Sequence, residues 1–114
     1  TTNMNRDDVS TTTQEYITRY REEFDMEPDM VGASAYDAFQ VLFESIRQVG
    51  TDDPAAMRDT IAGLKDFSTV TGNLIKYTEN GEAVKAVQIQ QVVDGKFKSK
   101  GEITDLNIIT PESK

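Results

Sequence analysis

The sequence contains no cysteine and no histidine. Without cysteine the chain has no disulfide framework, no thiolate nucleophile and no cysteine-bound metal. Without histidine it lacks the commonest general base and the commonest protein ligand for metals. It also lacks a glycine-rich phosphate loop and a nucleophile elbow. We therefore expect no catalytic residues, no metal site and no cofactor, although carboxylate chemistry alone stays open.

Long apolar runs and positive charge are also scarce. No stretch approaches the roughly 18 consecutive apolar residues of a membrane-spanning helix. Twelve Lys and Arg residues against 20 Asp and Glu give a formal charge of −8. Phosphate backbones and anionic membranes repel such a chain, so we expect no nucleic acid partner. The hydrophobic fraction of 37% supports a folded core, and 114 residues suit a single domain.

An initiator methionine and a signal-peptide pattern are absent, because the chain begins Thr1-Thr2-Asn3. We therefore expect a processed product or a piece of a longer protein.

Five carboxylates gather between residues 22 and 29 but lack the spaced pattern of a calcium loop. Solvated surface charge is the main expectation for them, and weak Ca²⁺ binding is the alternative.

Three helices are predicted from apolar side chains that recur every three or four residues. They cover residues 10–25, 33–48 and 54–65. The third has the clearest start, with Asp53 as N-cap and Pro54 at the first helical position. The second helix is apolar around more than half of its circumference. We therefore expect it to contact partners on two sides.

The remainder of the chain predicts an antiparallel β meander. Short strands are expected at residues 73–77 and 84–93, joined by a turn at Asn80-Gly81. Asp94-Gly95 is a second turn signal that leads into another strand. Residues 103–110 are expected to add one more strand.

Taken in order, these segments resemble the type I periplasmic solute-binding proteins of ABC transporters, the family of branched-chain amino acid receptors. The resemblance covers about residues 1–98, and none of its motifs is a chemical signature by itself. Thr1-Thr2-Asn3 is similar to the segment that leaves the hinge in such proteins. The other matching motifs are Pro28-Asp29, Tyr36-Asp37-Ala38, Asp53-Pro54, Val70-Thr71-Gly72, Asn80-Gly81 and Asp94-Gly95-Lys96-Phe97.

The resemblance implies an α/β fold of the type I periplasmic binding protein class. Residues 1–114 would form a single C-terminal fragment of a two-lobed protein, read as three helices followed by an antiparallel β hairpin or meander. Residues 1–66 would be its helical part. Residues 67–114 would be its β part, including a hinge crossing. The second helix would pack on a sheet that belongs to the rest of the protein.

The resemblance also implies a function without catalysis. The whole protein would be an extracytoplasmic component of an ABC uptake system that closes two lobes over an amino acid or similar small molecule. Its partner would be the transporter permease. Its location would be periplasmic or extracellular, with a membrane-anchored lipoprotein as an alternative.

The resemblance carries over only a few ligand contacts, at Val31, Ala33 and Ser34. Val31 stands where the family often has an aromatic residue, which puts a branched-chain amino acid ligand in doubt. Packing of Val31 under the helix start is an equal alternative. The fragment alone is expected to self-associate or exchange strands. The rival interpretations are a free-standing acidic α+β protein-interaction domain, which would dock through the second helix, and an enzyme fragment.

Overall fold

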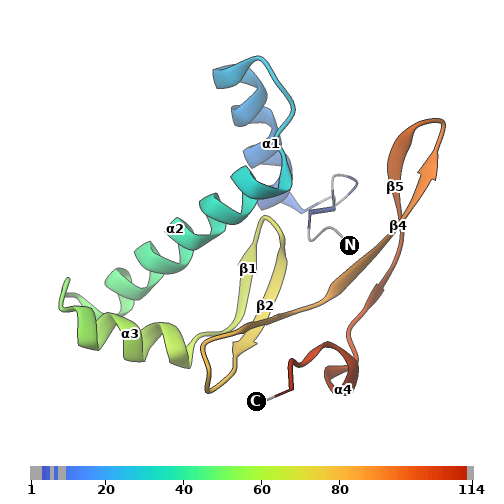
Figure 1. The fold of residues 1–114 in the computed structure, drawn as a ribbon. Coiled ribbons are helices and arrows are strands. Elements are labelled where there is room, and N and C mark those ends of the chain that lie inside the picture. Colours follow the sequence, from blue (N-terminus) through green and yellow to red (C-terminus); the bar gives the residue numbers. More distant parts are fainter. Residues whose placement is uncertain (1–3, 6, 8–9, 113–114) are drawn as a thin grey trace.

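The computed structural model describes residues 4–5, 7 and 10–112, so the Thr1-Thr2-Asn3 segment lies outside the described residues. The described residues form four helices and five strands (Figure 1). In chain order they are α1 Thr11–Phe24, α2 Met30–Val49, α3 Pro54–Gly63, β1 Lys65–Thr69, β2 Gly72–Tyr77, β3 Ala83–Lys85, β4 Val87–Val93, β5 Lys96–Ile103 and α4 Leu106–Ile109.

Capping side chains set the starts of the three long helices. The hydroxyl of Ser10 and the carboxylates of Asp29 and Asp53 each accept a hydrogen bond from the N–H three residues further on. Because Asp29 is a cap, α2 begins at Met30 and not at residue 33. It ends at Val49, and Gly50 caps it in the left-handed conformation with φ 70°.

The strands form two separate antiparallel sheets. Sheet A has the order β1-β2-β3, and sheet B pairs β4 with β5. The Asp94-Gly95 turn is confirmed, with both residues at positive φ. The Asn80-Gly81 hairpin is confirmed between β2 and β3, although only Gly81 of the two has a positive φ.

Two strand predictions are wrong. The strand at 84–93 is interrupted at Ala86, and its two parts pair in different sheets. Residues 103–110 do not form a strand, because β5 ends at Ile103 and a short helix follows. The Asp105 carboxylate accepts a hydrogen bond from the N–H of Asn107 and so caps that helix.

One strand was not predicted. β1 follows directly after α3, which ends at Gly63, so Lys65 belongs to a strand and not to the predicted helix. Phe67 is the only large apolar residue of β1, so its sequence carries no alternation that would predict a strand. The segment is a strand nonetheless, because its backbone pairs with β2.

The core consists of two small clusters of buried side chains. One joins α1, the start of α2 and the β1–β2 turn, and the other joins α2, α3 and sheet A. Their buried members are Met4, Tyr16, Ile17, Ala33 and Val70 in the first, and Val41, Leu64 and Leu74 in the second.

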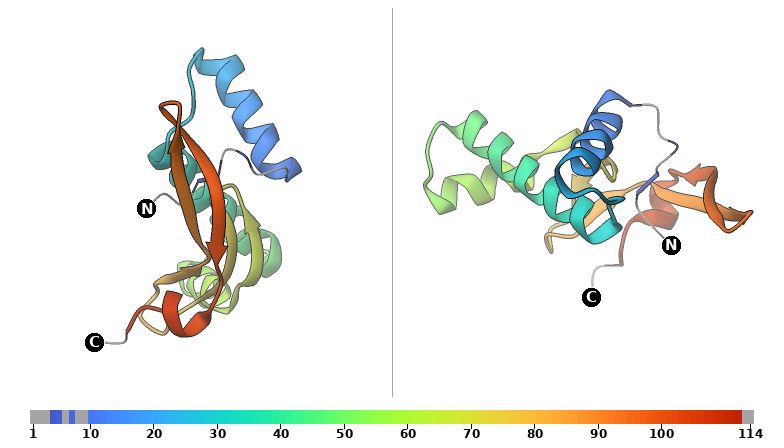
Figure 2. Two further views of the ribbon diagram at one scale, coloured as in Figure 1. Left: turned by 90° about the vertical axis from the view of Figure 1, so that its right-hand side faces the viewer. Right: turned by 90° about the horizontal axis from the view of Figure 1, so that it is seen from above.

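The overall shape is open. The radius of gyration is 15.4 Å, whereas a compact domain of this length has about 13 Å. Seen from above in the right-hand view of Figure 2, the end of α2 and α3 lie at one end and the β4–β5 ribbon projects at the other. Within the described part of the chain, no helix combines the length and apolarity needed to cross a bilayer.

Candidate functional site

The three residues expected to contact ligand lie on the first turn and a half of α2. Val31 is 71% exposed and Ser34 is also exposed. Ala33 is fully buried in the first core cluster with Tyr16 and Val70. Val31 therefore does not pack under the helix start, and the two exposed side chains flank a residue that anchors the turn.

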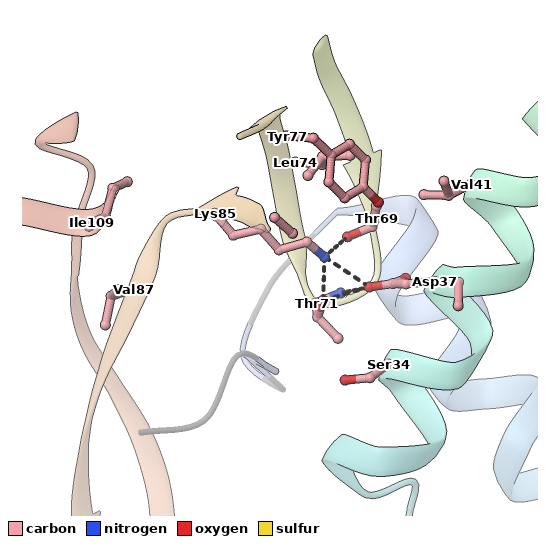
Figure 3. A pocket seen from close by; sticks show the side chains of 12 residues that line it. Ser34, Asp37, Val41, Thr69, Thr71, Leu74, Tyr77, Lys85, Val87 and Ile109 are labelled. Atoms are coloured by element: carbon pink, nitrogen blue, oxygen red, sulfur yellow. Dashed lines mark hydrogen bonds and ion pairs between the residues drawn. The ribbon is translucent and has the colours of Figure 1, made fainter. Parts of the chain in front are cut away.

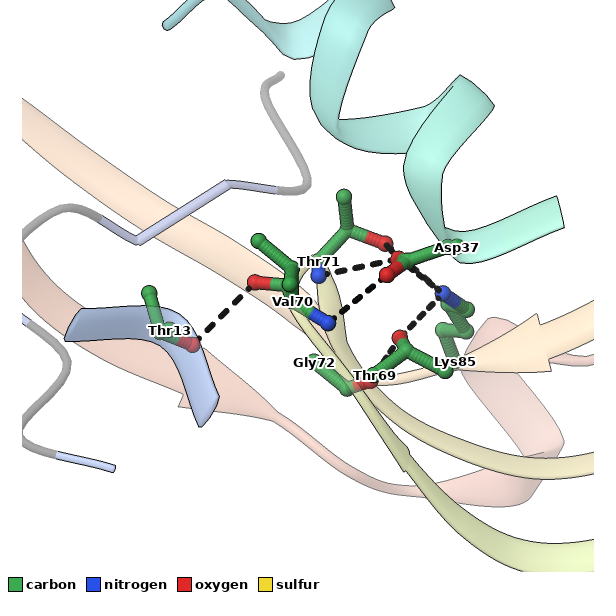
Figure 4. Close-up of polar contacts among 7 residues, drawn as sticks. All are labelled: Thr13, Asp37, Thr69, Val70, Thr71, Gly72 and Lys85. Carbon is green, nitrogen blue, oxygen red and sulfur yellow. Dashed lines mark hydrogen bonds and ion pairs between the residues drawn. The ribbon is translucent and has the colours of Figure 1, made fainter. Parts of the chain in front are cut away.

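Further along α2, the buried carboxylate of Asp37 holds the β1–β2 turn (Figure 4). Its Oδ1 accepts a hydrogen bond from the N–H of Val70 at 2.8 Å. Its Oδ2 accepts from the N–H of Thr71 at 3.0 Å and from the Thr71 hydroxyl. Hydrogen bonds to an ionised carboxylate are roughly twice as strong as neutral ones, so this contact fixes the turn against α2.

Lys85, the last residue of β3, completes the cluster from the other side (Figure 3). Its Nζ lies 3.3 Å from Asp37 Oδ2, 2.8 Å from Thr69 Oγ1 and 2.7 Å from Thr71 Oγ1. An ammonium has three N–H donors, so these three acceptors use all of them. The Lys85 and Asp37 side chains are only 16% and 7% exposed. We call Asp37, Thr69, Thr71 and Lys85 the polar cluster.

Helix α1 contacts the same turn. The hydroxyl of Thr13, which is fully buried, donates to the backbone carbonyl of Val70 at 3.4 Å. The turn is therefore hydrogen-bonded to α1 through the carbonyl of Val70 and to α2 through the N–H groups of Val70 and Thr71. A two-residue loop held on both sides cannot shift without breaking buried hydrogen bonds.

A cavity of about 410 Å³ opens beside the polar cluster (Figure 3). This volume lies within the usual range of small-molecule sites. α2 and sheet A form most of its wall, and the rest comes from the start of β4 and from α4. The lining residues are Ser34, Asp37, Ala38, Val41, Thr69, Thr71, Leu74, Tyr77, Ala83, Lys85, Val87 and Ile109. Of the three predicted contact residues, only Ser34 lines this cavity.

The cavity offers binding groups and no activated nucleophile. The polar cluster satisfies its own donors and acceptors. By contrast, the hydroxyls of Ser34 and Tyr77 have no hydrogen-bond partner within the described residues. Burial raises the pKa of Tyr77, and the Asp37 carboxylate raises it further, so the phenol is neutral near pH 7. Two neutral hydroxyls over apolar walls can orient a small molecule.

Two of the five acidic residues around the α1–α2 connection, Glu27 and Asp29, have structural partners. Glu27 forms a two-point ion pair with Arg21, with N–O distances of 2.8 and 2.9 Å. Asp29 caps α2 through the N–H of Gly32 at 2.7 Å. Within the described residues no three acidic side chains converge to hold a metal ion.

The outer face of α2 exposes aromatic rings. Phe39 and Phe43 are 58% and 57% exposed, and their ring centroids lie 6.1 Å apart. Tyr36 continues this row toward α1, where its ring lies 4.8 Å from that of Tyr16. The opposite face of α2 packs on sheet A through Val41. The predicted two-sided apolar helix is therefore present, with one side uncovered among the described residues.

Residues 1–97 match the sequence model of the family described as periplasmic binding protein. This match covers most of the chain, which therefore belongs to the periplasmic binding protein family. Members of this family are binding proteins and not enzymes. No curated protein matches the chain significantly in sequence.

Three solved structures illustrate the fold. The leucine binding protein LivK from Thermotoga maritima is 24% identical with a TM-score of 0.73, covering 90% of this chain and 29% of that one. LivJ from Streptococcus pneumoniae, a branched-chain amino acid transporter substrate binding protein in complex with isoleucine, is 22% identical with a TM-score of 0.72, covering 87% and 29%. An ABC transporter solute binding protein from R. palustris in complex with benzoate is 19% identical with a TM-score of 0.74, covering 88% and 28%.

These likenesses confirm the predicted type I periplasmic binding protein fold. The chain spans less than a third of the length of these solved structures. The polar cluster and its cavity were not predicted from the sequence. Two of their members, Asp37 and Thr71, nonetheless belong to motifs on which the resemblance rests.

Proposed function

We propose that the chain is the C-terminal portion of an extracytoplasmic solute-binding component of an ABC uptake system. The whole protein binds an amino acid or a similar small molecule by closing two lobes over it. The observation that carries this proposal is the family match over residues 1–97, together with the shared fold. Related structures hold isoleucine and benzoate, and both ligands are small carboxylic acids.

The division of the chain into two sheets supports the two-lobed mechanism. In this proposal residues 1–66 contribute a part that is helical up to Gly63, because β1 already begins at Lys65. Residues 67–114 contribute the β part, and the chain crosses between lobes within it. Sheet A ends at Lys85 and sheet B begins at Val87, so Ala86 is the natural position of one crossing. Ala86 pairs in neither sheet, so its backbone dihedral angles can change when the lobes close. Hinges are formed by such residues at the ends of secondary-structure elements.

At the ligand site, Val31 and Ser34 are proposed to contact the solute from the start of α2. Their exposure supports this role. Ala33, also predicted as a contact, is buried beneath them, so its part is to hold the turn. Val31 offers an apolar surface without a stacking ring, so it supplies no aromatic contact to the solute and does not favour a branched-chain amino acid.

The proposed partner of the whole receptor is the transporter permease, and the proposed location is the periplasm or the cell exterior, with a lipoprotein anchor as the alternative. The test is calorimetry of the receptor that contains this chain, titrated with a panel of amino acids, amides and aromatic acids. Saturable binding of one compound supports the proposal. Failure of the whole panel to bind would overturn the ligand class.

The exposed apolar surfaces support a second proposal, which concerns the chain when it is produced alone. Phe39 and Phe43 on α2, and Val92 and Phe97 on sheet B, are 57–63% exposed. We propose that copies of the 114-residue chain self-associate through these surfaces or exchange strands. Sedimentation velocity tests this, with Phe39→Ser/Phe43→Ser expected to shift the chain toward monomer and the exposed pair Lys65→Ser/Lys76→Ser as the matched control. A compact monomer of the unchanged chain would contradict the proposal.

The rival interpretation is a free-standing acidic interaction domain that docks a partner through the same face of α2. The exposed aromatic row on that helix is the observation in its favour. The mass of the natural product separates the two. A product about three times as long as this chain, as the coverage of the solved structures suggests, supports the receptor, whereas a product of this length supports the free-standing domain.

A further inference from the structure

Two sequence motifs that lie far apart in the chain meet in the fold. Asp37, from the Tyr36-Asp37-Ala38 motif, accepts hydrogen bonds from the N–H groups of Val70 and Thr71 in the Val70-Thr71-Gly72 motif (Figure 4). These residues are more than 30 positions apart in the chain. None of them has a proposed role in ligand binding, so their convergence calls for a separate explanation.

The third member of this contact is Lys85, which stands at the boundary between the two sheets. Its ammonium is almost enclosed and donates to Asp37, Thr69 and Thr71 at 2.7–3.3 Å. No N–H donor of Lys85 is left for a solute, although the side chain lines the cavity. A direct ligand contact by Lys85 would require the cluster to break.

The hydrogen bonding stops immediately after Lys85. Ala86 belongs to neither sheet, and β4 pairs only with β5. Among the described residues, no hydrogen bond or ion pair joins sheet B to α2, α3 or sheet A. The polar contacts of sheet B outside itself are with the N-terminal segment, from Gln90 to Met4 and from Lys98 and Ser99 to Asp7. A rotation at Ala86 would therefore leave every bond of the polar cluster intact.

We propose that Lys85 is a positioning residue that pins the end of sheet A to α2 and so places the pivot of the β3–β4 crossing at Ala86. Lys85 acts through its contacts with Asp37 and Thr71. Because Asp37 lies on α2, these contacts fix the end of β3 relative to the helix that bears Val31 and Ser34. The start of α2 and the crossing strand then move as one rigid unit when the lobes close. This inference rests on the proposed two-lobed function and adds the residue that defines where the rigid unit ends.

The distance between the start of α2 and β3, which the polar cluster joins, tests the proposal without any ligand. Because the chain has no cysteine, spin labels can be attached at Ala35→Cys on α2 and Ala83→Cys on β3, both exposed positions. Double electron–electron resonance then reports the distance distribution between the two parts, with unlabelled chain in excess to suppress distances between copies. We expect one narrow distribution with Lys85 present and loss of that narrow peak in Lys85→Met.

Two controls separate positioning from general stability. Lys76→Met removes an exposed lysine from β2 of the same sheet and should leave the narrow peak unchanged. Leu74→Ala destabilises sheet A but keeps the polar cluster, so the peak should also stay narrow. A narrow peak in Lys85→Met, or equal broadening in Leu74→Ala, overturns the inference. If Lys85→Met does not fold, Lys85→Gln removes the charge with a smaller change and is judged by the same criterion.

Binding by the longer receptor is measured separately, with L-leucine and benzoate as the probes. If one of them binds, Lys85→Met should weaken its binding while Lys76→Met should not. Unchanged affinity in Lys85→Met would contradict the positioning role. If neither probe binds to the unchanged receptor, the proposed ligand class fails, and the distance measurement still decides the role of Lys85.

Discussion

Replacing Asp37 with alanine should destabilise the chain more than any other single change in the polar cluster. The substitution leaves the buried N–H groups of Val70 and Thr71 without their acceptor and removes the counter-charge of Lys85. Each unsatisfied buried group costs about 1–3 kcal/mol, and breaking a buried ion pair from one side costs about 3–5 kcal/mol. Because these penalties overlap, we expect a loss of about 3–5 kcal/mol.

The same geometry predicts a smaller loss for Lys85→Met. In that variant the Asp37 carboxylate keeps three donors, the two backbone N–H groups and the Thr71 hydroxyl. Only the ammonium contacts disappear, and the methylene stem is largely retained by methionine. We expect a loss of about 1.5–3 kcal/mol, the range for hydrogen bonds to charged groups. The order of the two losses follows from which partner leaves buried backbone groups unpaired.

Urea unfolding followed by circular dichroism measures both losses, at a protein concentration low enough to keep the chain monomeric. A domain of this size has a total stability of about 5–15 kcal/mol, so the loss in Asp37→Ala is a large fraction of it. If that variant does not fold, Asp37→Asn keeps the shape and one acceptor oxygen, and its loss should be intermediate. A loss below about 1 kcal/mol in Asp37→Ala, or an equal loss in Lys85→Met, would refute the reasoning.

Three further predictions concern other parts of the chain. Leu74 is fully buried, so Leu74→Ala should lower the free energy of unfolding by about 2–5 kcal/mol in urea titrations. The hydroxyl of Tyr16 is buried without a partner among the described residues, so Tyr16→Phe should be neutral or stabilising by up to about 1 kcal/mol. The Arg47 guanidinium and then Gln48 lower the pKa of Glu44 to about 2, so Arg47→Gln should raise it toward 4.5 in an NMR titration. Because the folded pKa is depressed, the Glu44 contribution to stability is present above pH 4.5 and is lost as the pH falls toward about 2.

The helices were predictable because their determinants are local. Asp53 and Pro54 define the start of α3 within two adjacent residues, and Gly50 marks the end of α2. Such caps act through hydrogen bonds that span three or four positions, so a single sequence displays them completely. The start of α2 was misplaced because its cap, Asp29, lies before a first turn, Met30 to Ala33, whose side chains show no clear helical periodicity.

The polar cluster could not be predicted in the same way. Lys85 lies 48 positions from Asp37, and in the sequence it appears as one member of an alternating strand. The alternation of side chains along a strand indicates which residues share a face, but not which sheet they join. The change of pairing partner at Ala86 therefore cannot be predicted from it. The resemblance singled out Asp37 and Thr71 as motif members without saying that they touch. Their contact depends on how α2 packs against a turn formed much later in the chain.

The row of aromatic side chains on α2 gives a physical reason why the chain resembles part of a larger protein. Full burial of a side chain such as Phe39 or Phe43 contributes about 1.5–3 kcal/mol each, and both are more than half exposed. The opposite face of α2 is already occupied by sheet A through Val41, so the helix cannot rotate to bury the rings without breaking the Asp37 contacts. The polar cluster therefore fixes which face of α2 is left for another layer. In the proposed receptor the remainder of the lobe packs on this face of α2. For the chain alone, we expect another copy of the chain to cover it.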